Sequence, residues 1–314
     1  MKRIFVIFAL AATLVGCAKE DIVREAPRQA IGFGNPFVDN STRVAIDPSY
    51  SGTKSLASFN VYGTVTGNAN TINLFDGDPV TGSIGQAVWS CTEEQYWIPS
   101  CSYKFTAIAD ATSVAVDGYG MPTTITFNEN TTAGGDLLLA TATATTNADA
   151  TPSQNPVAFT FNHLLSKVKF TFSKPVYNNA RYSYKITGIQ FTNPYKQGVY
   201  NITNETWGSQ NIRTSAIDFG VGEAPITTTK LSVESNYARM LVPANYTDLG
   251  VSIAIETLLD GNSLGTQTIT ETLEANFEKG KAYNVVVTLG ENNLITFTVE
   301  KLTGWDSETN ISIP

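Results

Sequence analysis

The feature that most constrains this chain is an alternation of apolar and polar residues with a period of two, repeated along most of its length. Clear runs cover residues 59–65, 103–109 and 168–172. A period of two places alternate side chains on opposite faces of a β-strand, so each run predicts a strand with one face in a core and one toward water. Helical periodicity is nearly absent.

The amino-acid composition agrees with an all-β fold. Threonine is abundant, with many Tyr, Phe and Val, and these side chains suit a pleated, half-buried surface. Turn signals separate the runs, as at 76–79 and 117–120. Many short strands with short turns favour antiparallel β-sandwiches. Further strands are expected at 185–192, 237–243, 250–258, 266–274, 282–289 and 294–302.

The length and a composition shift suggest two domains. The chain has 314 residues, of which 42% are apolar, enough to bury a substantial core. Residues 141–156 lack large apolar groups and carry two prolines, so we expect a linker or long loop in the second half of this stretch and a domain boundary near residue 155. The predicted architecture is two tandem antiparallel β-sandwiches, an N-terminal one at 30–155 and a C-terminal one at 156–314.

The first residues read as an export signal. Lys2 and Arg3 precede an apolar stretch at 4–15, which is too short to span a bilayer permanently. The stretch ends in Leu-Val-Gly-Cys, which resembles the lipobox of bacterial lipoproteins. That resemblance implies a signal peptide at 1–16, acylation of Cys17, and an acylated tether at 17–29. An ordinary secretory cleavage site is the alternative.

Residues 19–21, Lys-Glu-Asp, resemble a signal that sends lipoproteins to the outer face of the outer membrane in some anaerobic Gram-negative bacteria. The alternative is a solvated, charged tether. With the lipobox, this pattern predicts a lipid anchor in the outer membrane and exposure at the cell surface.

Charge and chemistry exclude several function classes. The formal net charge is −8, which argues against a nucleic-acid partner or an anionic membrane surface. The chain has one histidine, His163, and it is expected to be a structural residue bonded to backbone, because no serine elbow accompanies it. Asp76 and Asp78 fit a turn better than a Ca²⁺ loop. We therefore expect no enzyme, no catalytic or metal-binding residue, and no cofactor.

Two cysteines follow the lipobox, Cys91 and Cys101. An exported protein folds where disulfides are permitted, and a strand-turn-strand segment could bring the two Cα atoms within bonding range. We predict a disulfide between them. The alternative is two reduced thiols packed as small apolar groups.

Three motifs together resemble the fimbrillin-like family, subunits of type V pili. Residues 159–170, Phe-Thr-Phe-Asn-His-Leu-Leu-Ser-Lys-Val-Lys-Phe, resemble one conserved segment of that family. Trp89 with Tyr-Trp-Ile-Pro at 96–99 and the strand at 103–107 resemble a second. Residues 279–287 and Trp305 resemble the ending of the family. The resemblance spans most of the chain.

The resemblance implies a pilus subunit built of two transthyretin-like β-sandwiches and assembled by strand exchange. In that family a trypsin-like protease cuts after an arginine and releases the first strand, whose groove then accepts a strand of a neighbouring subunit. Here the matching bond is Arg43–Val44, and residues 30–38 are the expected removable strand. Arg24 and Arg28 are rival cuts that would leave this strand in place. An ordinary surface role for Arg43 stays open.

The implied partners are other pilus subunits, copies of this chain or paralogues, and a surface ligand of unknown kind. The implied location is the outer membrane, and the fimbrium after processing. Residues 294–302 are expected to be the last strand of the second sandwich. The residues after Trp305, with Ile311 and Ile313 in alternation, are long enough for part of a donor strand.

A second function class is a surface glycan-binding lipoprotein that does not polymerise. It would use exposed rings as stacking platforms, and the candidates are Trp89, Trp97, Trp207 and the tyrosines.

Overall fold

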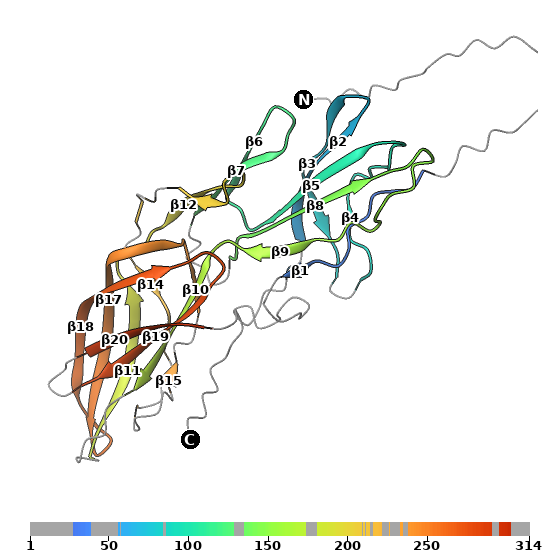
Figure 1. Ribbon diagram of the computed structural model, residues 1–314. Helices are drawn as coiled ribbons and strands as arrows, with labels where there is room; N and C mark the ends of the chain where they lie inside the picture. The colour runs from blue at the N-terminus through green and yellow to red at the C-terminus, as the bar shows by residue number, and fades with distance from the viewer. Residues whose placement is uncertain are drawn as a thin grey trace, which may run out of the picture.

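The computed structural model describes residues 28–38, 56, 58–83, 86–128, 135–173, 181–208, 210, 212–213, 216–221, 226, 233–234, 238–290 and 295–302. Within these ranges the regular structure is twenty β-strands and no helix, which confirms the all-β prediction. This part of the chain accordingly offers no helix that could cross a membrane. Figure 1 shows the strands in an upper and a lower group.

The upper group is built on a seven-stranded sheet with the order β1-β9-β8-β5-β2-β3-β4. Its pairings are antiparallel except for β1–β9, which is parallel. The strands are β1 (Phe37–Val38), β2 (Ser58–Gly67), β3 (Asn70–Thr81), β4 (Ser90–Cys91), β5 (Ser102–Ala109), β8 (Leu138–Thr145) and β9 (Thr160–His163).

A small second sheet lies beside the seven-stranded sheet, and Figure 1 shows it next to β5. Its order is β13-β12-β7-β6. The strands are β6 (Ser113–Val116), β7 (Pro122–Asn128), β12 (Gln197–Asn201) and β13 (Thr206–Trp207). Tyr62 of β2 and Ile108 of β5 share a buried cluster with Ile125 and Tyr200 of this sheet. The second face of β2 and β5 is therefore covered at Tyr62 and Ile108, where the expectation of a water-facing side is wrong, whereas Asn60 and Lys104 on the same face are exposed as predicted.

The lower group has two further sheets. One has the order β15-β10-β19-β20, with β16 also paired to β10, and the other has the order β14-β11-β17-β18. The strands are β10 (Ser166–Ser173), β11 (Tyr182–Phe191), β14 (Ile217–Asp218), β15 (Val233–Glu234), β16 (Arg239–Leu241), β17 (Ala244–Leu259), β18 (Asn262–Phe277), β19 (Ala282–Leu289) and β20 (Ile295–Lys301).

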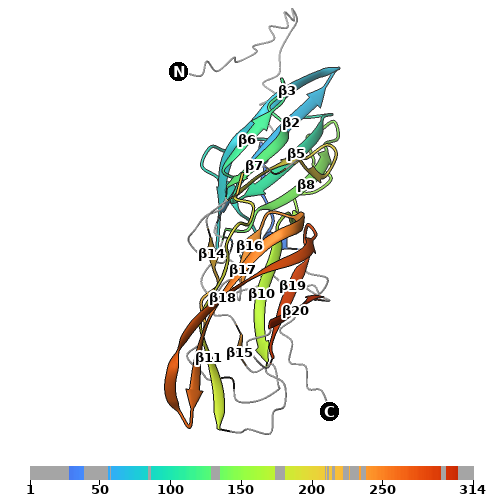
Figure 2. The ribbon, with the colours of Figure 1, turned by 90° about the vertical axis from the view of Figure 1, so that its left-hand side faces the viewer.

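Apolar side chains from both of these sheets meet in one core. The rings of Phe170 in β10 and Phe219 after β14 meet edge to face with centroids 4.7 Å apart, and Phe191 of β11 lies 5.0 Å from Phe219. Figure 2 shows the lower sheets turned by 90°. The central β10–β19 pair is parallel, which departs from the purely antiparallel expectation.

The buried side chains show where the chain passes from the core of the upper group to the core of the lower group. Val157, Phe159 and Phe161 are fully buried in the core of the seven-stranded sheet, whereas Val168 and Phe170 belong to the lower core. The change of core therefore falls after Phe161, and the domain boundary near residue 155 stays a prediction. In addition, β12 pairs with β7, so the later half contributes to the upper group. The division into two transthyretin-like sandwiches stays a prediction.

One expected turn is part of a strand. Residues 76–79 lie within β3, where the register shifts between the pairs Tyr62–Asp76 and Val61–Asp78. Gly77 falls between them with φ of 78°, a conformation that glycine adopts without a Cβ penalty. The Asp-Gly signal therefore marks a β-bulge, which bends a strand without ending it.

Candidate functional site

The N-terminal segment, residues 28–38, enters the upper group, where residues 31–34 and 36 are buried. Its backbone is hydrogen-bonded on two sides. On one side the Phe33 amide donates to the Trp89 carbonyl at 2.9 Å, and the Trp89 amide returns a bond of 2.7 Å to the Phe33 carbonyl. On the other side the Gly34 amide donates to the Val157 carbonyl at 2.7 Å. The segment therefore occupies an inner position between two extended stretches of chain.

The two neighbours run in opposite directions relative to the segment. The bridges to Trp89 and Tyr96 are antiparallel, whereas the bridge from Phe33 to Val157 is parallel. The parallel contact continues into the β1–β9 pairing, where Phe37 lies opposite Thr160. A strand in this place has a defined direction and register, because a slip by one residue would turn its apolar side chains away from the core.

Phe33 anchors the segment in the core. Its side chain is 0% exposed. Its ring stacks on Phe159 at a centroid distance of 5.6 Å and an angle of 17°. Edge-on contacts follow with Phe75 at 5.6 Å and Phe105 at 6.0 Å. Ile31, two residues earlier, is also buried in this cluster. These contacts fit the expectation that residues 30–38 form a strand that occupies a groove of the subunit.

A clamp from Asn155 holds the backbone before Phe33. The Asn155 carboxamide oxygen accepts a hydrogen bond of 3.1 Å from the Gly32 amide. Its nitrogen donates to the Ala30 carbonyl at 3.3 Å. One side chain thus bonds both a backbone N–H group and a backbone carbonyl of the segment, as a neighbouring strand would. Sequence reasoning placed Asn155 in a linker and gave no signal for this role, because the contact joins residues far apart in the chain.

The glycines of the segment fit close neighbours. A Cβ at Gly32 would lie 2.7 Å from Cγ1 of Val88, whereas a Cβ at Gly34 would meet nothing nearer than the Val157 carbonyl at 3.5 Å. The side chain at position 32 must therefore be absent or displace Val88. Val88 is about half exposed, so its methyl group has room to move.

Two tryptophans expected to be exposed platforms are buried against this segment. Trp89 is 0% exposed and stacks on Phe59 at 6.0 Å. Trp97 is 4% exposed, and its amide donates to the Gln29 carbonyl at 3.1 Å. Neither indole nitrogen has a hydrogen-bond partner in the described part of the chain. Trp207 is half-buried, and its indole donates to the Leu164 carbonyl at 2.9 Å. The prediction of an exposed stacking platform is therefore wrong for Trp89 and Trp97.

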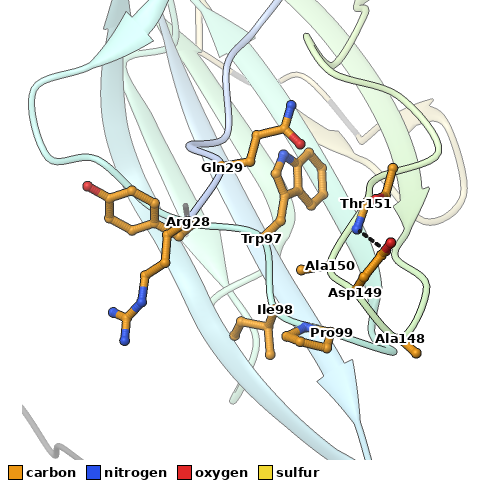
Figure 3. A pocket seen from close by; sticks show the side chains of 10 residues that line it. Arg28, Gln29, Trp97, Ile98, Pro99, Ala148, Asp149, Ala150 and Thr151 are labelled. Carbon is orange, nitrogen blue, oxygen red and sulfur yellow. Dashed lines mark hydrogen bonds between the residues drawn. The ribbon is translucent and has the colours of Figure 1, made fainter. Parts of the chain in front are cut away.

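An open pocket of about 670 Å³ lies at the beginning of the segment. Figure 3 shows Trp97 at its centre, with Gln29 on one side and the loop carrying Asp149 and Thr151 on the other. The Thr151 amide donates to the Asp149 carboxylate at 3.1 Å, and hydrogen bonds from Thr151 lower the pKa of that exposed carboxyl. Arg28 and Gln29, the two described residues before the expected strand at 30–38, line this pocket.

The expected disulfide does not form, and Cys91 and Cys101 are both free. Cys91 lies opposite Val80, which pairs with Phe59 near the start of β2. Cys101 precedes Ser102, which pairs with Thr66 at the other end of β2. The two thiols thus lie at opposite ends of the sheet, with β2 and β3 between β5 and β4. Burial and the nearby Asp78 raise the pKa of the Cys91 thiol to about 12.

His163 is buried, as expected of a structural histidine, but its Nδ1 contacts the carboxylate of Asp136. The expectation of a backbone partner missed this residue, because nothing in the Gly-Gly-Asp run at 134–136 indicates where its side chain points. The Asp136 amide in turn donates a hydrogen bond of 3.1 Å to the carboxylate of Asp110. Among the described residues no three His, Cys, Asp or Glu side chains gather as a metal site.

Several predicted sites lie outside the described residues: Cys17, Arg43, Val44 and the tail after Leu302, including Trp305. The last described strand, β20, pairs antiparallel with β19 from Tyr283–Lys301 to Leu289–Ile295. Residues 295–301 therefore form a strand of the lower sheet, as expected for 294–302.

One family model matches this chain. A family model described as fimbrillin-like matches residues 42–305. This range covers most of the chain and contains the three motifs that suggested the resemblance. No curated protein sequence matches the chain significantly.

Solved structures share the fold over nearly the whole chain. A fimbrial protein from Bacteroides vulgatus ATCC 8482 has 21% identity and a TM-score of 0.64, with 88% of this chain and 99% of that chain covered. A protein from Bacteroides uniformis ATCC 8492, assigned to cell adhesion, has 16% identity and a TM-score of 0.54, with 87% and 98% covered. A similarly assigned protein from Bacteroides ovatus ATCC 8483 has 14% identity and a TM-score of 0.50, with 89% and 98% covered.

Proposed function

The chain belongs to the fimbrillin-like family, and from this membership we propose that it is a structural and adhesive subunit of a cell-surface pilus, exported as a lipoprotein and assembled by protease-triggered strand exchange. The family is one of structural and adhesion proteins at the cell surface and not of enzymes. The partners of the subunit are copies of this chain or paralogous subunits.

The observation that supports strand exchange is the placement of residues 28–38. The segment is bonded on both sides and inserts Phe33 into the centre of a core. Burying a large apolar side chain contributes about 1.5–3 kcal/mol, so Ile31 and Phe33 together contribute about 3–6 kcal/mol. A segment held this way stabilises the subunit while it is attached, and its loss would open a groove with an aromatic floor.

The trigger is hydrolysis of the Arg43–Val44 peptide bond. A trypsin-like protease adds water across this bond, leaving a carboxylate on Arg43 and an amine on Val44. Before the cut the segment is tethered to β2, which gives it a large effective concentration over any free donor strand. After the cut that advantage ends, and a strand from another subunit can take the place by β-augmentation.

The test compares the purified precursor with its Arg43→Ala variant under limited trypsin digestion. The wild type is expected to form SDS-resistant, heat-sensitive multimers whose subunits begin at Val44. The Arg43→Ala chain is expected to form none. Cleaved wild type that shows no SDS-resistant multimers at high concentration, even with other subunits added, would overturn strand exchange.

The donor is tested in the same assay. Deleting the residues after Trp305 should leave cleavage at Arg43 unchanged yet stop multimer growth, if this tail supplies the incoming strand. Multimers of undiminished length from the truncated chain would assign the donor to another part of the subunit.

The lipid anchor rests on Cys17. Cys17→Ala should abolish incorporation of a fatty-acid label and release the exported protein from the membrane fraction. A Cys91→Ala variant is the matched control and should keep both the label and the membrane association. Unchanged labelling of Cys17→Ala would remove the lipoprotein assignment.

A further inference from the structure

The edge strands of the four sheets differ sharply in length. Where the described sheets end, the terminal strands are mostly two or three residues long. Those of intermediate length are β6 with four residues and β20 with seven. The exception is β18, which has sixteen residues. Short edges are one device by which proteins avoid pairing with other chains, because an edge exposes unpaired backbone groups. This device is applied to the other edges and not to β18.

The first half of β18 also lacks the residues that usually prevent an edge strand from pairing with another chain. Residues 262–270, Asn-Ser-Leu-Gly-Thr-Gln-Thr-Ile-Thr, contain no charged residue and no proline. Lysine, proline and inward-pointing charges are the usual protection of an exposed edge. Nearly all of this stretch is exposed, and Leu264 is 59% exposed. By contrast, the β20 edge ends in Glu300 and Lys301. Figure 1 shows β18 at the outer side of the lower group, and among the described strands it pairs only with β17.

The side chains of β18 alternate in a self-complementary way. Ile269 packs against the lower core, and Leu273 is buried in it. The even-numbered positions 266, 268, 270 and 272 point to the opposite face, and all four are exposed threonines. Their pairing with β17 is regular from Thr266–Glu256 to Leu273–Leu249. This part of the edge is therefore straight enough to accept another strand.

We propose that β18 is an interaction surface at which two copies of this chain pair antiparallel about a two-fold axis at Thr268. In that register Thr268 faces its own copy, and each Thr266 faces the other copy's Thr270. Threonine pairs directly opposite each other stabilise antiparallel strands. The two four-stranded sheets then join into one sheet, and each copy contributes the same surface, as in other two-fold interfaces.

Charge selects this arrangement over a parallel one. Antiparallel pairing about Thr268 places Glu271 opposite Gly265 and Glu274 opposite Asn262. Parallel pairing in register would place Glu271 opposite Glu271 and Glu274 opposite Glu274, and like charges directly opposite each other are destabilising. A second copy in the antiparallel direction is therefore the partner that fits the edge.

This contact goes beyond strand exchange. Strand exchange links subunits through residues 28–38 and a donor strand, whereas the β18 contact would join subunits sideways and leaves that segment untouched. A single pair of edges is a small interface and is expected to associate weakly. Repeated contacts between two polymers would add to a much stronger association. Because the chain carries a net charge of −8, pairing should increase with salt, which screens repulsion between copies.

The direct test places a cysteine on the proposed axis. The uncleaved chain is used in a Cys17→Ala background, so that neither strand exchange nor lipid contributes to association. Thr268→Cys should form a covalent dimer under mild oxidation, because directly opposite residues of an antiparallel pair have Cα atoms about 4.5–5.5 Å apart, within the range of about 4.4–6.8 Å that a disulfide spans. Ser263→Cys is the matched control: it lies on the same strand but faces residue 273 of the copy, and should give little dimer. The parent chain should give none, since its thiols are buried or half-buried.

A second measurement does not depend on disulfide geometry. Thr268→Lys places two positive charges opposite each other on the axis and should reduce dimerisation at least tenfold in sedimentation equilibrium. Thr298→Lys makes the same change at an exposed threonine of the β20 edge and should have no effect. Circular dichroism checks that both variants keep the fold. A monomer at all concentrations and salt levels, equal effects of the two lysines, or equal crosslinking of Thr268→Cys and Ser263→Cys would each overturn the proposal.

Discussion

The ring of Phe33 stacks on the ring of Phe159, with centroids 5.6 Å apart and planes inclined by 17°. The two residues belong to segments that run parallel, bridged by Phe33 and Val157. Phe159 precedes β9, and Phe33 precedes β1, so this pair joins the N-terminal segment to the first core before the two strands meet. The stability of the segment in its groove should therefore depend on this ring.

Phe33→Ala should destabilise the uncleaved chain by about 3–5 kcal/mol, because it removes a buried ring and leaves a cavity among four aromatic neighbours. Phe33→Leu fills most of the space and should cost less than about 1.5 kcal/mol. Urea unfolding measures both. An alanine variant as stable as the leucine variant would contradict the role of Phe33 as the anchor.

Asn155→Ala should cost about 1 kcal/mol, since it removes two hydrogen bonds to the backbone of the segment at a site open to water. Asn155→Asp should be at least as harmful at neutral pH. Its carboxylate can still accept from the Gly32 amide but faces the Ala30 carbonyl with no donor. Hydrogen exchange at Gly32, followed by NMR or mass spectrometry, should quicken in both variants. Unchanged exchange would show that the clamp does not hold the segment.

Cys91 should resist alkylation in the folded protein. Its pKa is raised from 9.0 to about 12, so at pH 8 its thiolate fraction is roughly 1000-fold below that of an ordinary thiol. A raised pKa means that the folded state holds the proton more tightly, and reactivity should return only as the pH approaches 12. Mass spectrometry after iodoacetamide treatment, with a denatured control, measures this. A mass showing a Cys91–Cys101 disulfide would contradict the structure.

Asp136→Ala should destabilise the chain by about 1–3 kcal/mol, because it removes the carboxylate that His163 contacts in a buried position. Asp110→Ala is the matched control: it also removes a bond, to the Asp136 amide, but at an exposed side chain. Its cost should be no more than about 1 kcal/mol. Equal losses in chemical unfolding for the two variants would show that burial of the Asp136–His163 pair is not the cause.

The sequence determined the strands, because alternation is a local property. The runs at 59–65, 103–109 and 168–172 coincide with β2, β5 and β10 within a few residues. Local rules failed where a signal has two structural outcomes. Asp-Gly at 76–77 fits a tight turn and a bulge equally well, and the pairing of β3 with β2 decided for the bulge.

Only the tertiary structure decided which faces and partners those strands have. Alternation indicates that Trp89 and Trp97 have a preferred side, but the N-terminal segment that covers them comes from a distant part of the chain. The same holds for Cys91 and Cys101, which are near in sequence yet separated by the order of strands in the sheet. The sequence by itself carried the fold class, the resemblance to the family and the expectation of an N-terminal strand at 30–38. The inner position of that segment, the Asn155 clamp and the open edge of β18 depend on contacts between residues far apart in the chain, and no local pattern encodes them.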